Sequence, residues 1–162
     1  MSCYGKCGNG PVPYPSTDNI RPDKKMAKAL CDSFTGEMSA INSYIYYSVI
    51  FADTAPSLSD TFSELAMTEM VHFRLLAQSI KRLGANPALC FKLTTVPVND
   101  GICHAQCEAG KAIERSICDE TAAYEEYRLL AECTCDAALR AVLDRLAEDE
   151  KEHRKILEEL WI

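Results

Sequence analysis

Apolar residues recur every three or four positions over most of this 162-residue chain, which is the period of amphipathic α-helices. Asp53 to Pro56 interrupts the pattern, Ser57 and Asp60 resemble a capped restart, and Gly84 is a natural stop. The pattern predicts four helices: residues 23–51, residues 57–84, a segment after residue 104, and a segment that follows a short break at 133–136.

Two segments lack the helical period. Residues 1–22 hold Cys, Gly, Pro, Asn and Ser and are expected to form an irregular tail. Residues 85–104 form a long connection between the second and third helices. We therefore predict an all-α bundle over residues 23–162, made of two helical hairpins joined by one long crossover.

Acidic residues and histidines interrupt the apolar stripe of each predicted helix. Two of the three histidines follow a glutamate by three residues, as Glu69-x-x-His72 and Glu150-x-x-His153. Residues three apart share one face of a helix, so each pair presents a carboxylate and an imidazole together. The six predicted metal ligands are Glu37, Glu69, His72, Glu120, Glu150 and His153.

The two halves of the chain repeat this arrangement. In each half a glutamate is followed by alanine at +3 and tyrosine at +7, which gives the pairs Glu37/Tyr44 and Glu120/Tyr127. The repeat predicts a pseudo-two-fold bundle in which each half supplies one set of ligands. Tyr44 and Tyr127 are interpreted as hydrogen-bond donors to the carboxylates, with ordinary core packing as the alternative.

Four carboxylates buried together require positive charge, because each unpaired one costs several kcal/mol. Two divalent cations balance four glutamates. We expect Glu37 and Glu120 to be terminal ligands and Glu69 and Glu150 to bridge, with one histidine on each ion. Oxygen and nitrogen ligands suit transition metals, with iron as the first choice and manganese or a mixed pair as alternatives.

With these residues the chain resembles the ferritin-like di-iron carboxylate superfamily over residues 23–161, above all the four-helix domain of rubrerythrins and the manganese catalases. The resemblance implies that the reduced metal pair reacts with hydrogen peroxide or dioxygen. It implies either peroxide reduction with electrons from an external redox protein or catalase-like disproportionation. Rubrerythrins also place a second glutamate one turn along the third helix, where this chain has Ala123.

Two further hypotheses stay open at this point. One is a non-catalytic protein that binds or stores iron. The other is a structural bundle in which the metal only adds stability.

Net charge and hydropathy limit the classes of partner and the cellular location that we expect. The net charge of −7 argues against nucleic acid, and no apolar stretch is long enough to cross a membrane. The N-terminus lacks the basic and apolar pattern of a signal peptide, so a cytoplasmic location is expected. The resemblance also implies a homodimer.

The nine cysteines are not expected to form a disulfide framework, because their number is odd and the chain is long enough to fold without one. A second metal site or a thiol relay is the alternative to plain reduced cysteines for the closely spaced pairs. These pairs are Cys3/Cys7, Cys103/Cys107 and Cys133/Cys135. Small apolar fillers are expected at Cys31, Cys90 and Cys118.

Overall fold

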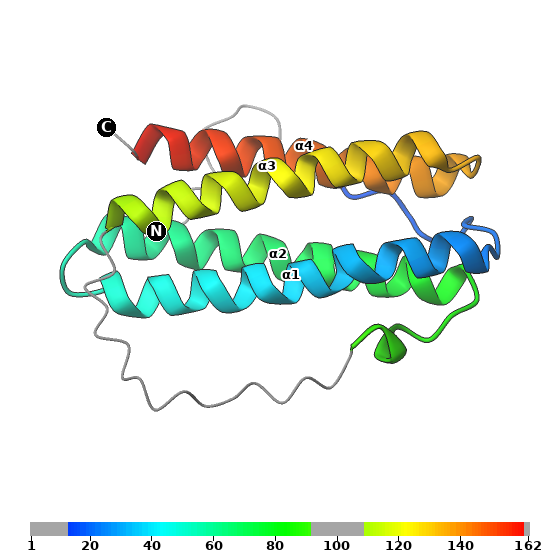
Figure 1. Cartoon of the computed structure of the whole chain (residues 1–162), viewed down its shortest axis with the longest axis horizontal. Coiled ribbons are helices and arrows are strands. Elements are labelled where there is room, and N and C mark those ends of the chain that lie inside the picture. Colours follow the sequence, from blue (N-terminus) through cyan, green and yellow to red (C-terminus); the bar gives the residue numbers. More distant parts are fainter. Residues whose placement is uncertain (1–12, 92–108, 161–162) are drawn as a thin grey trace.

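The chain folds as a four-helix bundle in the computed structural model, which describes residues 13–91 and 109–160. Figure 1 shows the α1–α2 hairpin lying alongside the α3–α4 hairpin, as the helical period predicts. None of the described helices is both long and apolar enough to cross a membrane. The elements are α1 (Lys24–Phe51), α2 (Pro56–Arg82), the short 3₁₀-helix η1 (Pro87–Cys90), α3 (Ala109–Cys133) and α4 (Ala137–Leu160).

Local sequence sets the helix ends. The Asp23 carboxylate accepts hydrogen bonds from two backbone N–H groups at the start of α1, and Asp136 does the same for α4. The predicted cap of α2 by Ser57 is wrong, because α2 starts at Pro56 and has no side-chain cap. Proline suits this first position since its φ is already helical and it has no N–H to satisfy. Gly84, with φ of 92°, ends α2 as predicted.

The apolar core is divided into two clusters. One surrounds Leu30, Leu76 and Leu143, and the other surrounds Phe62 and Leu157. All five of these side chains are fully buried, and burial of each contributes roughly 1.5–3 kcal/mol. Between the two clusters the inward-facing positions of all four helices carry acids and histidines. The apolar ends therefore hold in place a polar middle that would not assemble alone.

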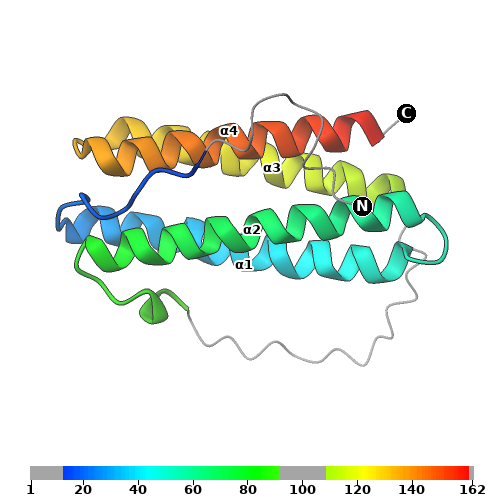
Figure 2. The same cartoon turned by 180° about the vertical axis from the view of Figure 1, so that it is seen from behind.

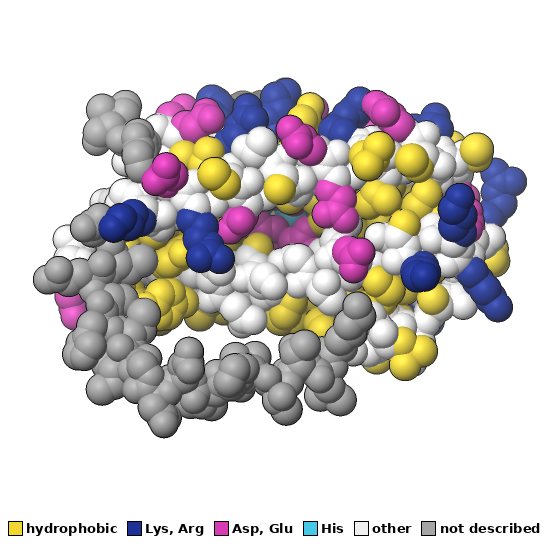
Figure 3. All heavy atoms as spheres, in the orientation of Figure 1, with side chains coloured by type: hydrophobic (Ala, Val, Ile, Leu, Met, Phe, Trp, Pro, Cys, Tyr) yellow, Lys and Arg dark blue, Asp and Glu magenta, His cyan; other side chains and the backbone are white. Residues whose placement is uncertain are grey.

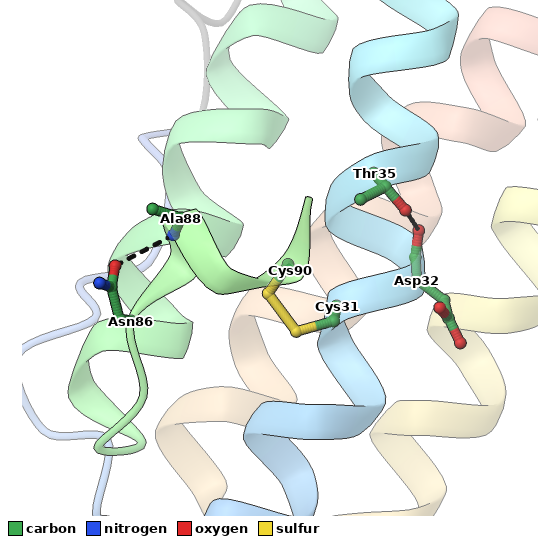
Figure 4. The surroundings of a disulfide bond; sticks show 6 residues. All are labelled: Cys31, Asp32, Thr35, Asn86, Ala88 and Cys90. Carbon is green, nitrogen blue, oxygen red and sulfur yellow. Dashed lines mark hydrogen bonds between the residues drawn. A yellow bond between two sulfur atoms is a disulfide. The ribbon is translucent and has the colours of Figure 1, made fainter. Parts of the chain in front are cut away.

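A disulfide joins Cys31 in α1 to Cys90 in η1, with Cα atoms 5.0 Å apart (Figure 4). The prediction that these two cysteines are apolar fillers is therefore wrong, and so is that for Cys118, which is exposed. Cys133 and Cys135 are free and exposed at the α3–α4 turn. The two partners of the disulfide lie 59 residues apart, so no local spacing marks them. The remaining closely spaced cysteines, Cys3, Cys7, Cys103 and Cys107, lie outside the described residues, as does His104.

Residues 13–23 are not helical before α1 begins, yet they pack against the bundle. Thr17 and Ile20 are buried, and the backbone N–H of Asp23 donates to the carbonyl of Leu83. Figure 2 shows this dark blue segment crossing from the start of α1 to α4. It therefore covers the bundle on the side of α2 and α4.

Candidate metal centre

The six predicted ligands come together in the middle of the bundle, with exposed fractions between 0 and 5%. They form two overlapping groups, and the candidate ligand atoms of each group lie within 4.8 Å of one another. Two of the glutamates belong to both groups. The first group is Glu37, Glu69, His72 and Glu150, and the second is Glu69, Glu120, Glu150 and His153.

The first group surrounds Nδ1 of His72. This nitrogen lies 2.9 Å from Oε2 of Glu69 and 3.0 Å from Oε1 of Glu150. An oxygen of Glu37 lies farther away, at 3.8 Å. One imidazole nitrogen and three carboxylates thus face a common point.

The second group surrounds Nδ1 of His153 in the same way. Oε1 of Glu69 lies 2.9 Å away, Oε2 of Glu150 lies 3.1 Å away, and an oxygen of Glu120 lies 3.5 Å away. Glu69 and Glu150 therefore turn one oxygen toward each histidine, which is the arrangement that a bridging carboxylate needs. The two halves match as the internal repeat predicts.

The donor set fits a pair of divalent cations. Oε1 of Glu69, both carboxylate oxygens of Glu150 and Nδ1 of His153 are buried without a well-aligned hydrogen bond. Buried polar atoms of this kind are rare unless an ion or another ligand satisfies them. Carboxylate and imidazole ligands suit iron and manganese better than they suit the thiol-rich sites of structural zinc.

The electrostatics of the ion-free cluster separate the glutamates into two classes. Burial, together with the charges of Glu69 and Glu150, raises the pKa of Glu37 well above its usual value. Burial and the same two charges also raise the pKa of Glu120. Burial opposes ionisation of Glu69 as well, but the close imidazoles of His153 and His72 lower its pKa overall.

Glu150 behaves like Glu69. Burial and the Glu69 charge oppose its ionisation, yet the two histidines lower its pKa. Burial lowers the pKa of an imidazole, but the surrounding carboxylates reverse this effect and raise the pKa of His72 and His153 well above the usual value. In the ion-free cluster Glu37, Glu120 and the two histidines thus hold their protons more tightly than usual, whereas Glu69 and Glu150 lose theirs more readily.

Tyr44 and Tyr127 lie against the two carboxyl groups predicted to be terminal. The Tyr44 hydroxyl donates to Oε1 of Glu120, and the Tyr127 hydroxyl donates to Oε1 of Glu37. Each tyrosine thus reaches across the α1–α3 interface to the glutamate of the other half. Burial raises the pKa of both hydroxyls, so each keeps its proton for this bond. The bond leaves the second oxygen of each glutamate free to face an ion.

A set of residues that the sequence did not reveal surrounds His72. Oδ2 of Asp149 lies 3.2 Å from Nε2 of His72, and Arg145 pairs with Asp149. The Arg145 guanidinium lies 4.6 Å from the centre of the Tyr14 ring. Burial and a hydrogen bond with Asp149 raise the pKa of Tyr14 to about 12.

This set breaks the internal repeat. In the other half, Thr68 stands at the position of Asp149, and Glu64 stands at that of Arg145. The sequence could have indicated the ion pair, because Arg145 and Asp149 are spaced i,i+4 and Asp149 directly precedes Glu150. Nothing in the sequence indicates the position of Tyr14, because it lies in a segment without periodicity.

A cavity of about 330 Å³ leads from the surface to the carboxylates between α1 and α3. Its base includes Glu37, Glu69, Glu120 and Glu150, and Ala123 is part of its wall. In Figure 3 a hollow opens between these two helices, with acidic side chains at its base. The site is thus open toward α1 and α3 and covered toward α2 and α4 by residues 13–23.

A ferritin-like bundle with two Glu-x-x-His pairs and two further glutamates defines the class of dinuclear carboxylate proteins. The family model described as Rubrerythrin matches residues 28–161, which is most of the chain. The chain therefore belongs to the rubrerythrin family. A comparison with curated proteins finds no match.

Proposed function

We propose that this protein is an oxidoreductase that reduces hydrogen peroxide or dioxygen at a pair of divalent transition-metal ions. The observation that carries the proposal is the sharing of Glu69 and Glu150 between two ligand groups. Shared carboxylates hold two ions close together, so that one substrate O–O group can contact both. Iron is the first choice, and manganese or a mixed pair is the alternative.

The metal pair would supply two electrons and polarise the O–O bond when bound. The chain supplies the surroundings. Glu37, Glu69, Glu120 and Glu150 balance the charge of two divalent ions, and His72 and His153 add one nitrogen each. The cavity between α1 and α3 admits the substrate on the side of the terminal carboxylates.

Tyr44 and Tyr127 both line this cavity as well as donating to the terminal glutamates. Each holds its proton at the phenolic oxygen up to high pH because burial raises its pKa. Their role is to orient Glu120 and Glu37 and to place one hydroxyl beside each terminal carboxyl in the cavity.

This chain differs from the ligand pattern that the resemblance implies, because Ala123 stands where rubrerythrins place a second glutamate on the third helix. A glutamate at this position would extend toward the terminal carboxylates, whereas alanine leaves part of the cavity wall open. The proposed chemistry therefore does not use a carboxylate that changes place with the oxidation state.

The proposal is tested by measuring metal content by mass spectrometry together with oxygen release and peroxide consumption. About two iron ions per chain and peroxide loss without oxygen release support a peroxide reductase. Oxygen release with manganese would instead indicate catalase-like disproportionation. Bound, reduced metal that consumes neither peroxide nor dioxygen in a single turnover would favour iron storage or a purely structural metal, and would contradict the proposal.

Variants of the shared ligands test the site itself. Glu69→Ala and Glu150→Ala should each lower the metal stoichiometry sharply while leaving the helical content intact. Glu64→Ala is the matched control, because Glu64 is an exposed glutamate on the same helix as Glu69. Retention of two ions in either ligand variant would refute the bridging roles.

An external redox protein as electron donor, a homodimeric state and a cytoplasmic location remain predictions. A donor is required for reductase chemistry, because each reduced peroxide removes two electrons from the metal pair. Analytical ultracentrifugation would determine the oligomeric state.

A further inference from the structure

The cavity above the carboxylates is larger than hydrogen peroxide or dioxygen needs. A water molecule takes about 30 Å³ in the liquid, so a molecule with two oxygen atoms needs roughly 60 Å³. The cavity of about 330 Å³ includes the space for two ions at its base, but it is still larger than this and falls within the size range of pockets for organic ligands. The excess room lies between α1 and α3, where a four-helix bundle normally packs large side chains.

Small residues create this room on both helices. Gly36 and Ala40 lie one turn apart on α1, and Ser116 and Ala123 face the same cavity from α3. A Cβ atom placed on Gly36 would meet no atom within 4 Å. Gly36 is exposed, so the space beside it is empty of protein and open to the surface.

The charges around the cavity indicate what can enter. Two divalent ions would balance the four glutamates at the base. The other charged residues that line the cavity are Arg115, Asp119 and Glu126, which together carry a net charge of −1. Arg115 lies 3.9 Å from Asp119, so its charge is already engaged. An anionic substrate is disfavoured, and an uncharged one meets no such barrier.

We infer that the cavity between α1 and α3 binds the organic group of a small, uncharged organic hydroperoxide, R–O–O–H, with its O–O end at the glutamate base. This inference rests on the proposed function and names its substrate class. The organic group would lie along Gly36, Ala40 and Ala123.

The reaction balances without any further group. The hydroperoxide takes up two electrons and two protons, its O–O bond breaks, and R–OH and water leave. The electrons come from oxidation of the two divalent ions to the trivalent state, and an external redox protein returns them. The protons come from solvent at the cavity mouth.

Binding is tested first with cumyl alcohol, the unreactive product of cumene hydroperoxide. Isothermal titration calorimetry of the full metal-loaded chain should give saturable binding with a Kd on the order of millimolar. Gly36→Leu should weaken it about tenfold or more, because the new side chain occupies the space of the organic group. Replacing glycine in a helix interior does not endanger folding.

Two further variants complete the test. Ala40→Leu fills the same cavity one turn away and should have the same effect as Gly36→Leu. Ser63→Leu is the matched control, since it adds the same bulk on the exposed surface of α2. It should bind cumyl alcohol like the unaltered chain.

Turnover then separates the inference from the proposed function. Gly36→Leu should slow the consumption of cumene hydroperoxide about tenfold or more relative to its effect on hydrogen peroxide, because the larger substrate needs the space that leucine fills. Hydrogen peroxide turnover without saturable alcohol binding, or with no turnover of cumene hydroperoxide, would overturn the inference and leave the proposed function standing. If the reduced, metal-loaded chain consumes neither peroxide in a single turnover, both are overturned.

Discussion

Loading the metal centre should release about four protons per chain at neutral pH. The expectation follows from the four ligands whose pKa lies well above the usual value in the ion-free cluster: Glu37, His72, Glu120 and His153. Each of them holds its proton more tightly than usual, and an ion that binds there displaces that proton. With these four groups protonated and Glu69 and Glu150 ionised the cluster is neutral, so the loss of four protons offsets the four positive charges of two divalent ions.

The magnitude is large enough to measure without ambiguity. Release of four protons makes the overall association constant for two ions rise by about four powers of ten per pH unit, or about 5.4 kcal/mol. The sign is set by the raised pKa values. Affinity falls as pH falls, and the slope flattens only when pH rises above the pKa values of the ion-free cluster.

The same groups set the stability of the ion-free protein. Their contribution is complete below the pKa values of the unfolded chain and is lost as pH rises through the higher pKa values of the folded state. The ion-free protein should therefore become less stable toward alkaline pH. The loaded protein, which has already lost these protons, should not show this decline.

The assay is calorimetric titration of the ion-free chain with Mn²⁺ in buffers of different ionisation enthalpy, without oxygen. Glu120→Gln, which has no carboxyl proton to lose, should reduce the release to about three protons if two ions still bind. Glu64→Gln on the exposed surface of α2 should leave the release at about four. Release of fewer than about two protons with two ions bound would show that the cluster is ionised before loading, and would refute the reasoning.

Three other predictions concern the supports of the bundle and the site. Cys31→Ser should lower the free energy of unfolding by about 2–4 kcal/mol under non-reducing conditions, because the disulfide spans 59 residues; an unchanged Tm in thermal circular dichroism would contradict this. Asp136→Ala should cost about 1 kcal/mol, because α4 loses its cap. The backbone N–H of Leu139 and of Arg21 lowers the pKa of Asp136, so this difference in Tm should shrink as pH falls through that pKa. Tyr127→Phe should weaken metal binding about tenfold, since Glu37 loses its donor, whereas Tyr124→Phe on the same helix should not; equal affinities in a competition titration would exclude an orienting role.

The fold and the ligand cluster could be read from the sequence because both depend on periodic spacing. Helical periodicity places Glu69 and His72 on one face whatever the tertiary structure, and the internal repeat doubles that constraint. Because buried carboxylates need positive charge, Glu37 and Glu120 are expected to face the same ions as Glu69 and His72. The predicted residues converge because each lies on the stripe that its helix buries in the bundle.

The contacts that the sequence did not predict lack such a constraint. Cys31 and Cys90 meet because η1 folds back over α1, and nothing in the spacing of cysteines specifies that turn. Tyr14 reaches the site because residues 13–23 pack across α2 and α4, and segments without periodicity carry no information on where they lie. The start of α2 at Pro56 was not predicted, because Ser57 and Asp60 have the spacing of a capping box although they do not cap the helix.

The two sides of the metal centre differ in the side chains that they present and in their access to the surface. Both histidines come from α2 and α4, on the side that residues 13–23 cover, where Tyr14, Arg145 and Asp149 stand behind His72. The terminal carboxyls and both tyrosine hydroxyls come from α1 and α3, and they line the open cavity. A substrate of the proposed reaction would therefore enter on the side of the carboxyls and hydroxyls. His72 and His153 do not line the cavity, and both imidazoles are buried from solvent.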